Sequence, residues 1–490
     1  MMKLIGYVPD SDPTIPGSIT NCDAFVPSIK GMTGAPSPVS SGISALAAAC
    51  RGAATLRQLD NTTLLFAGTA TKLYKASGTS WADVTRAVGG DYTLTSTCRW
   101  RFAQYGNVSL AVNKADTLQY TTSGAFAKVT KGGTDAPKAS IVETVGQFVF
   151  LFDYDNGTSY TDGWICSAYG DYTDWTLSAT TQCTSGRLIS TPGIIMAGKS
   201  FGEQIVVYKD RSMYIGTYTS GAAVWTFNLV PGQTGALSQE SVVNVGTVED
   251  PRHIFMGIDD FYSFDGSRPI PIGEGWVKNT VFTELNQTYS YACQAVYDRA
   301  NSRVYFYYPS SSNDTCDKCV VYNTRTKQWG RDNRSIEACI DYSTAGATYA
   351  DVGTMYSTYA SIPSTATYGS LFQSGSSIQP AIFNTSHTIY TLTGEPGDSF
   401  FVTGDIGNED SFTLLQRVRP IFINAPTTAT MTNYYRNNLG ESLSVDQTAT
   451  YSNGKFDVLR SARWHRLKMS FTGNVEIANF TPILQQEGAE

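Results

Sequence analysis

Short hydrophobic runs separated by Gly, Ser and Thr recur along this chain, most clearly in residues 64–85. This stretch, LLFAGTATKLYKASGTSWADVT, contains three strand-sized runs bounded by turn residues. The same layout returns in residues 109–130 as SLAVNKADTLQYTTSGAFAKVT, with Tyr120 in the place of Tyr74. The pattern predicts a repeated unit of short β-strands.

Looser copies of this unit follow, and each carries an aromatic anchor. The anchors are Tyr74, Tyr120, Trp164, Tyr214, Tyr262 and Tyr322. Their separations are 46, 44, 50, 48 and 60 residues. A period of about 40–50 residues built from several short strands is typical of β-propeller blades. One blade cannot bury both of its faces, so neighbouring blades must stack around an axis. The sequence therefore predicts an all-β fold with a propeller of six or seven blades.

The repeats account for only part of the chain. Residues 1–45 are rich in Pro, Gly and Ser and predict an extended arm that packs on the C-terminal domain or on a neighbouring subunit. The propeller is expected over residues 46–345. Residues 346–397 are interpreted as a linker that could also supply a last blade. Strand-length runs over residues 398–490 predict a C-terminal β-sandwich-like platform domain.

Composition and charge narrow the classes of function. Asp and Glu number 42 against 35 Lys and Arg, a net charge of −7, which argues against a surface that grips nucleic acid phosphates. No apolar run approaches about 18 residues, and the first residues, MMKLIGYVPDSDP, lack the pattern of a secretion signal. The nine cysteines are scattered, as expected for reduced, buried thiols.

The segment GIIMAGKS, residues 193–200, satisfies the expression for a phosphate-binding loop. Such a loop follows a buried strand and opens a helix, whereas the following residues, FGEQIVVY, are typical of another strand. We therefore expect Lys199 and Ser200 to begin a propeller blade and Lys199 to bind no nucleotide.

Other combinations of polar residues form no recognisable catalytic or metal-binding motif. Cys316 and Cys319 make a CDKC turn without a second ligand pair at zinc spacing. The run DYDNGTSYTDG at residues 153–163 lacks the Gly and the closing Glu of a calcium loop. The three histidines stand in unrelated contexts. The sequence thus predicts no catalytic residue, no cofactor and no metal.

Two basic runs are candidates for contact with partners: RWR at residues 99–101 and RSARWHRLK at residues 460–468. If the second run is one strand, Ala462, Trp464, Arg466 and Lys468 share a face, because alternate residues do so in strands. The alternative is an ordinary solvated strand face. The candidate docking residues are Arg460, Arg463, Trp464, Arg466 and Lys468.

The order of several motifs resembles that of the propeller-bearing tail nozzle or hub proteins of short-tailed, podovirus-type phages, also called packaged-DNA stabilisation or tail tubular proteins. The matching blocks are NCDAFVPSIKGMTGAPSP at 21–38, LLFAGTATKLYKASGTSWADVT at 64–85, RWRFAQYGNVSLAVNKADTLQY at 99–120, CSAYGDYTDWTLSA at 166–179, GIDDFYSFDGSRPIPIG at 257–273, VVYNTRTKQWGR at 320–331 and RSARWHRLKMSF at 460–471. The resemblance spans nearly the whole chain.

The resemblance implies a structural protein of the virion, assembled in the host cytoplasm, and no enzyme. It implies a homohexameric ring below the portal and its adaptor, which conducts DNA without specific binding, supports a plug and docks tail fibres or tailspikes. No membrane insertion is expected. The alternative is a carbohydrate-binding or depolymerising β-propeller of a tail fibre, in which exposed aromatic residues and the acids Asp174 or Asp259 would act.

Overall fold

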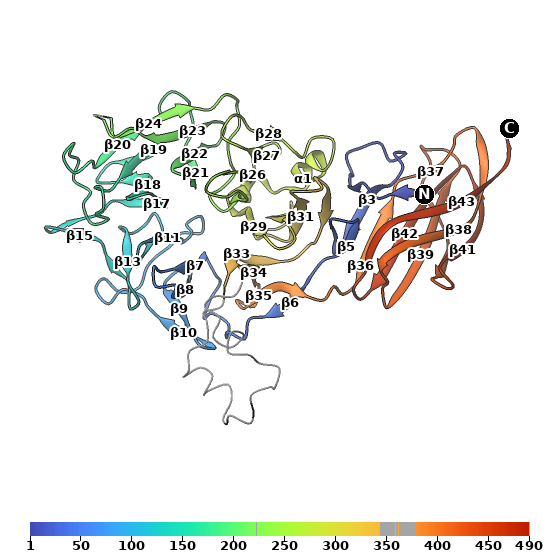
Figure 1. Cartoon of the computed structure of the whole chain (residues 1–490), viewed down its shortest axis with the longest axis horizontal. Coiled ribbons are helices and arrows are strands. Elements are labelled where there is room, and N and C mark those ends of the chain that lie inside the picture. Colours follow the sequence, from blue (N-terminus) through green and yellow to red (C-terminus); the bar gives the residue numbers. More distant parts are fainter. Residues whose placement is uncertain (222, 344–357, 359–360, 362–377, 490) are drawn as a thin grey trace.

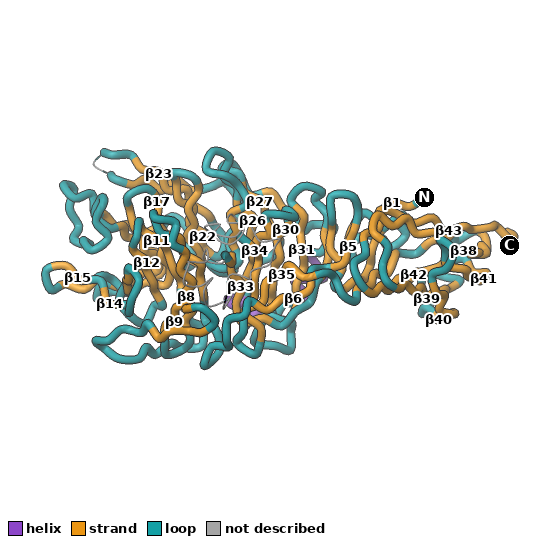
Figure 2. Tube along the Cα trace, turned by 60° about the horizontal axis from the view of Figure 1, so that its bottom comes forward, coloured by secondary structure: helices purple, strands orange, loops and turns teal. Residues whose placement is uncertain are grey.

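The computed structural model describes residues 1–221, 223–343, 358, 361 and 378–489. They form two β-rich bodies in line, a ring of sheets and a narrower sandwich, with both termini at the sandwich end (Figures 1 and 2). The helices of this part of the chain are one α-helix, α1 (Lys278–Glu284), and one 3-10 helix, η1 (Gln287–Ala292). The all-β prediction is confirmed. Neither described helix is long and apolar enough to cross a membrane.

The ring is a β-propeller whose first three blades are separate four-stranded sheets. The first contains β7 (Ala53–Arg57), β8 (Thr63–Gly68), β9 (Leu73–Ser77) and β10 (Ser80–Asp83). The second contains β11 (Arg101–Tyr105), β12 (Val108–Val112), β13 (Gln119–Thr121) and β14 (Ala127–Lys128). After the hairpin of β15 (Thr130–Lys131) and β16 (Thr134–Asp135), the third contains β17 (Lys138–Val145), β18 (Phe148–Asp155), β19 (Ser159–Cys166) and β20 (Thr184–Arg187).

Three further blades follow in chain order. The fourth contains β21 (Ile195–Phe201), β22 (Gln204–Lys209), β23 (Met213–Tyr218) and β24 (Trp225–Leu229). The fifth contains β25 (Val242–Asn244), β26 (His253–Met256), β27 (Phe261–Phe264) and β28 (Ile270–Pro271). The sixth contains β29 (Gln294–Asp298), β30 (Arg303–Tyr308), β31 (Lys318–Asn323) and β32 (Trp329–Arg331), which belong to a larger, ten-stranded sheet.

The last blade joins distant parts of the chain. It pairs β33 (Ile336–Tyr342), β34 (Gln379–Asn384) and β35 (Ile389–Gly394) with β6 (Ser37–Ser40) from the N-terminal region. The first strands of the seven blades contact one another in sequence, and β33 contacts β7 to close the ring. Of the predicted linker over residues 346–397, residues 346–357, 359–360 and 362–377 lie outside the described residues, and residues 379–394 belong to the last blade.

The blade strands follow from the sequence pattern. In β8 the run Leu64–Gly68 is buried throughout, because neighbouring blades cover both faces of the sheet. A two-residue turn joins β9 to β10, and its first residue, Gly78, has φ +59°, which glycine adopts without strain. The predicted anchor aromatics pack in the blade cores: Tyr214, Tyr262, Tyr322 and Trp164 are buried, and Tyr74 and Tyr120 are partly buried.

The C-terminal body is the predicted β-sandwich. Its strands are β36 (Ser399–Thr403), β37 (Ile406–Gly407), β38 (Ser411–Asn424), β39 (Thr428–Arg436), β40 (Ser444–Thr450), β41 (Phe456–Ala462), β42 (Trp464–Thr472) and β43 (Glu476–Ala489). A seven-stranded sheet contains β36, β37, β39, β40 and β42, and the other sheet contains β38, β41 and β43. One hydrophobic core, with Phe401 and Leu467 from the first sheet and Leu415 and Phe480 from the second, fills the space between them.

The N-terminal strands connect the two bodies. They are β1 (Met2–Lys3), β2 (Gly6–Tyr7), β3 (Ser18–Asp23), β4 (Phe25–Pro27) and β5 (Met32–Gly34). Strands β2 and β3 extend the seven-stranded sheet, whereas β4 pairs with β32 and β5 pairs with β43. One sheet therefore runs from the sixth blade into the sandwich, and the arm is ordered by strands of the same chain.

Asp260 is a buried carboxylate in the fifth blade, close to where the arm meets α1. The residue is 1% exposed, and its Oδ2 atom has no hydrogen-bond partner among the described residues. Burial raises the pKa of Asp260 from 3.8 to about 6, although the Phe261 N–H and the charge of Lys278 oppose this effect. Folding therefore favours the protonated carboxyl.

Replacing Asp260 by asparagine should stabilise the protein at neutral pH. The pKa of Asp260 is higher in the folded chain than in the unfolded chain, so ionising this carboxyl destabilises the fold. This loss of stability is absent below about pH 4 and complete above about pH 6. A shift of about 2 units corresponds to about 3 kcal/mol. Thermal unfolding of the unmodified protein between pH 4.5 and 8 should show a stability that falls as the pH rises. In Asp260→Asn this fall should be smaller. The control Asp314→Asn, at an exposed position, should keep the full pH dependence. An unchanged pH profile in Asp260→Asn would contradict this account.

Candidate functional site

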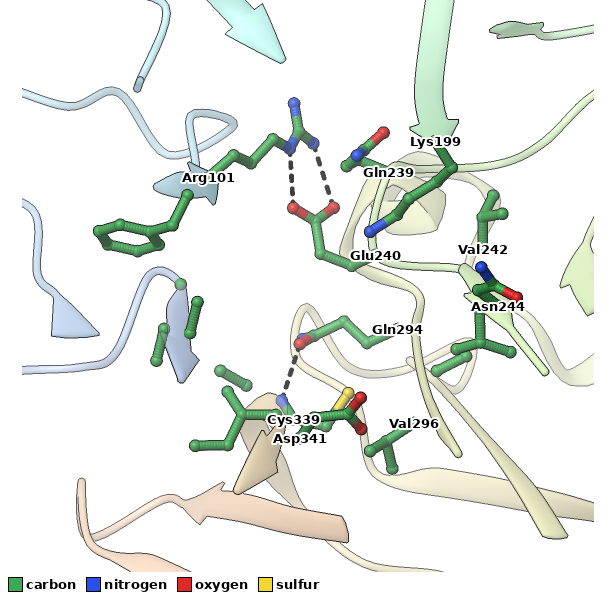
Figure 3. A pocket seen from close by; sticks show the side chains of 18 of the residues that line it. Arg101, Lys199, Gln239, Glu240, Val242, Asn244, Gln294, Val296, Cys339 and Asp341 are labelled. Atoms are coloured by element: carbon green, nitrogen blue, oxygen red, sulfur yellow. Dashed lines mark hydrogen bonds and ion pairs between the residues drawn. The ribbon is translucent and has the colours of Figure 1, made fainter. Parts of the chain in front are cut away.

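The first strands of the seven blades surround a central channel with a cavity of about 340 Å³ (Figure 3). Each strand is short and presents alternate side chains to the axis. The charged residues that line the cavity are Arg99, Arg101, Glu143, Lys199, Glu240, Arg299 and Asp341. Because charged side chains from several blades meet in this channel, it is our candidate site.

Arg101 and Glu240 form the best-defined ion pair of the channel. The Arg101 Nε atom lies 2.8 Å from Glu240 Oε1, and Nη2 lies 3.1 Å from Oε2. Arg101 also donates from Nη1 to the Ser140 carbonyl at 2.9 Å. Burial raises the pKa of Glu240, but the charges of Arg101 and Arg99 outweigh it, and the pKa ends below its ordinary value. Glu240 is therefore ionised and held in one geometry.

The other charges lie around the remaining wall. Arg299 Nη2 is 3.3 Å from Asp341 Oδ2. Burial raises the pKa of Asp341, and the charges of Arg299 and Lys199 oppose it. Burial likewise raises the pKa of Glu143 against the charge of Lys199 and a hydrogen bond from Ser200. Lys199 thus lies within electrostatic reach of two carboxylates on other blades.

Two glutamine side chains tie the first strands together. Gln239 accepts from the Gly198 N–H at 2.7 Å and donates to the Gly198 carbonyl at 2.9 Å. Gln294 accepts from the Cys339 N–H at 3.0 Å and donates to the Glu337 carbonyl at 3.0 Å. These bonds satisfy both backbone and amide groups, so the channel wall is a fixed polar scaffold.

A second cavity of about 260 Å³ forms the mouth of the channel. It shares Arg99 and Arg101 with the channel and adds Lys114 and Asp153, which form an ion pair. Because Arg99 and Arg101 line both cavities, the mouth adjoins the channel.

The structure places the phosphate-loop match where the sequence predicted. Lys199 and Ser200 lie inside β21, the first strand of the fourth blade, and β22 follows directly. The segment opens no helix, and the prediction of a strand is confirmed. Lys199 lines the channel.

The other motifs are dispersed. His253 contacts Tyr208 Oη and the Ser200 carbonyl, His387 contacts Glu337, and His465 contacts the Thr413 carbonyl, so the histidines share no site. Asp153 pairs with Lys114 and Asp162 with Arg187. Cys316 and Cys319 are buried thiols. Over the described residues, no group of three His, Cys, Asp or Glu side chains could hold a metal ion.

The two acids named for the alternative function also lie apart. Asp174 pairs with Lys131 at 2.9 Å, and Asp259 accepts from the Tyr262 hydroxyl at 2.8 Å. They belong to the third and fifth blades, so they cannot act as one pair of acid and base.

The candidate docking residues lie in the sandwich and contact groups of the same chain. Arg466 forms a two-point ion pair with Asp405, at 3.0 and 2.8 Å. Arg460 lies 2.6 Å from Asp446 and over the Tyr435 ring. Trp464 is 7% exposed. Arg463 lies over the Phe412 ring, and Lys468 over the Phe400 ring.

The single strand predicted over residues 460–468 is wrong. The chain crosses at Arg463 from β41, in one sheet, to β42, in the other. Arg460 therefore belongs to a different sheet from Arg466 and Lys468. Alternation does hold within β42, where Leu467 is buried between the partly exposed Arg466 and Lys468.

No protein-family model and no curated protein matches this sequence. Similar solved structures include YCF48 bound to D1 peptide (10% identity, TM-score 0.39, 76% of this chain and 98% of that chain). They also include YCF48 from Cyanidioschyzon merolae (8% identity, TM-score 0.37, 73% of this chain and 98% of that chain). A third is BBS1N in complex with ARL6DN (11% identity, TM-score 0.39, 72% of this chain and 97% of that chain). These chains share little sequence with this protein, and the fold described above rests on its own strand pairing.

The sequence did not identify the channel as a site. Its charged residues come from β11, β17, β21 and β33, from the segments before β11 and β25, and from the residue after β29, so no local motif contains them. The sequence held one signal for the channel, which was the position of basic residues within the repeats. RWR at residues 99–101 and GKS at residues 198–200 each lie in or beside the strand that begins a blade.

Proposed function

We propose that this protein is a structural subunit of a short-tailed phage tail, a nozzle or hub that assembles as a homohexameric ring below the portal and adaptor. The observation that carries the proposal is the ten-stranded sheet that joins the sixth blade to the sandwich through β4 and β5. Sheet hydrogen bonds and a shared core resist bending between the two bodies. A subunit of a ring that withstands DNA pressure needs such a joint.

The DNA conduit would form between subunits. The channel of one propeller has a cavity of only about 340 Å³ and contains the Arg101–Glu240 pair, so no duplex fits through it. A closed ring repeats one heterologous contact by rotation, and six subunits is what the family resemblance implies. The net charge of −7 favours a neutral to acidic lumen, from which phosphates are repelled.

In this proposal the sandwich is the platform on which partner proteins dock. The cations on β41 and β42 face carboxylates or aromatic rings of the same chain, and this internal pairing holds the sheets in shape. Contact with adaptor, fibre or tailspike would use the rims of this platform. Arg460 and Arg463, at the corner between the sheets, are the first positions to test.

Electron microscopy of the purified protein tests the assembly. We expect six-fold rings with a central opening, and light scattering should give six times the mass of one chain. A monomer at micromolar concentration, both alone and with the adaptor, would contradict the ring. Gel filtration of rings with linear duplex DNA at low salt tests the conduit, because tight, salt-dependent retention would contradict passage without binding.

A further inference from the structure

Arg99 occupies the point where the channel and its mouth meet. The residue lies one position before the buried Trp100 and lines both cavities. Its side chain donates one long hydrogen bond, from Nη1 to the Glu337 carbonyl at 3.4 Å. A guanidinium group carries five N–H donors in a planar fork. The other donors of Arg99 therefore have no hydrogen-bond partner among the described residues.

The charges that line the two cavities do not balance. The cations are Arg99, Arg101, Lys114, Lys199 and Arg299, and the anions are Glu143, Asp153, Glu240 and Asp341. Three cations have a carboxylate within 4.0 Å: Arg101, Lys114 and Arg299. Lys199 and Glu143 influence each other electrostatically. Within the described part of the chain, Arg99 and Lys199 have no carboxylate within 4.0 Å, and of these two only Arg99 lines both cavities.

The nearest groups cannot supply the missing negative charge. Burial raises the pKa of Cys50 and of Cys316 to about 12 and that of Cys293 well above its ordinary value, although the charge of Arg99 opposes each shift. These thiols are therefore neutral at physiological pH. Glu240 already binds Arg101 with both oxygens.

We propose that Arg99 binds a small oxyanion at the mouth of the propeller channel, through two parallel N–H···O bonds. The shared chemistry of the ligand is a pair of oxygen atoms with about one negative charge, as in a carboxylate or a phosphate. Guanidinium groups recognise such pairs in this way. The mouth of about 260 Å³ admits only a small group, and Arg101, which also lines it, is fixed there by Glu240.

Calorimetric titration of the full chain tests the site, with sodium acetate and sodium phosphate as probes and sodium chloride at equal ionic strength as the reference. We expect saturable binding of at least one oxyanion. Binding of acetate alone would assign a carboxylate, and binding of phosphate alone a phosphate group. Binding of neither would overturn the proposal.

Three variants separate this role from general electrostatics. Arg99→Gln should weaken binding about tenfold or more, because a charge-assisted bidentate contact is lost. Arg57→Gln, an exposed arginine on β7, should bind like the unmodified protein. Glu240→Gln should bind the anion about tenfold more tightly, because a nearby negative charge is removed.

Equal affinity in Arg99→Gln and the unmodified protein would overturn the assignment. If Arg99→Gln does not fold, Arg99→Lys replaces it, since lysine keeps the charge and loses the fork. In that case a severalfold loss of affinity supports the site, and an unchanged affinity contradicts it.

Discussion

Replacing Asp405 by alanine should lower the free energy of unfolding by about 3–5 kcal/mol, the usual range when one partner of a buried ion pair is removed. Asp405 has no exposed side-chain surface and lies between β36 and β37. It binds Arg466 of β42 with both oxygens and Arg436 of β39 with Oδ2. Its backbone N–H donates to the Pro13 carbonyl at 2.7 Å, so it also holds the N-terminal arm.

The size of the effect follows from what alanine leaves behind. The side chains of Arg436 and Arg466 are only 12% and 20% exposed, and without the carboxylate two like charges face each other. Denaturant unfolding, followed by the fluorescence of the neighbouring Trp464, measures the change. The control is Asp457→Ala, whose carboxylate is 61% exposed and pairs with Lys455, and we expect a loss below about 1 kcal/mol there. Equal stability of the two variants would refute the role of Asp405.

Trp329→Ala should also cost about 3–5 kcal/mol, because a large buried ring is removed and a cavity remains. Trp329 lies in β32, is 0% exposed and packs against Phe261 and Tyr322, with ring centroids 4.9 and 4.8 Å away. Its indole N–H donates to the Ile272 carbonyl at 3.1 Å. The residue therefore connects the fifth and sixth blades at the strand that pairs with the arm.

The loss of Trp329 should loosen the joint between the bodies as well as the blades. Limited proteolysis of Trp329→Ala should cut near the arm faster than in the unmodified protein. Trp329→Phe keeps most of the apolar contact and should lose less stability. Tyr169→Ala removes an aromatic ring that is 56% exposed and should change stability by less than about 1 kcal/mol. If Trp329→Ala resists proteolysis and is as stable as the unmodified protein, the joint does not depend on this side chain.

Local pattern was enough to determine the kind of structure. The spacing from Tyr74 to Tyr322, the Gly-bounded turns and the short apolar runs predicted a propeller, because each blade repeats the same local pairing of neighbouring strands. The strand-like run FGEQIVVY after GIIMAGKS likewise predicted a strand, and not a helix, around Lys199.

Tertiary structure alone decided which distant segments pair. The closing strand β6 lies about 350 residues before its partner β35, and β4 and β5 join two bodies whose other strands are hundreds of residues away. Backbone hydrogen bonds are alike at every position, so the partner of such a strand is chosen by packing and not by a local signal. For the same reason the channel, and the place of Arg99 between its two cavities, became visible only when the first strands of all the blades met around one axis.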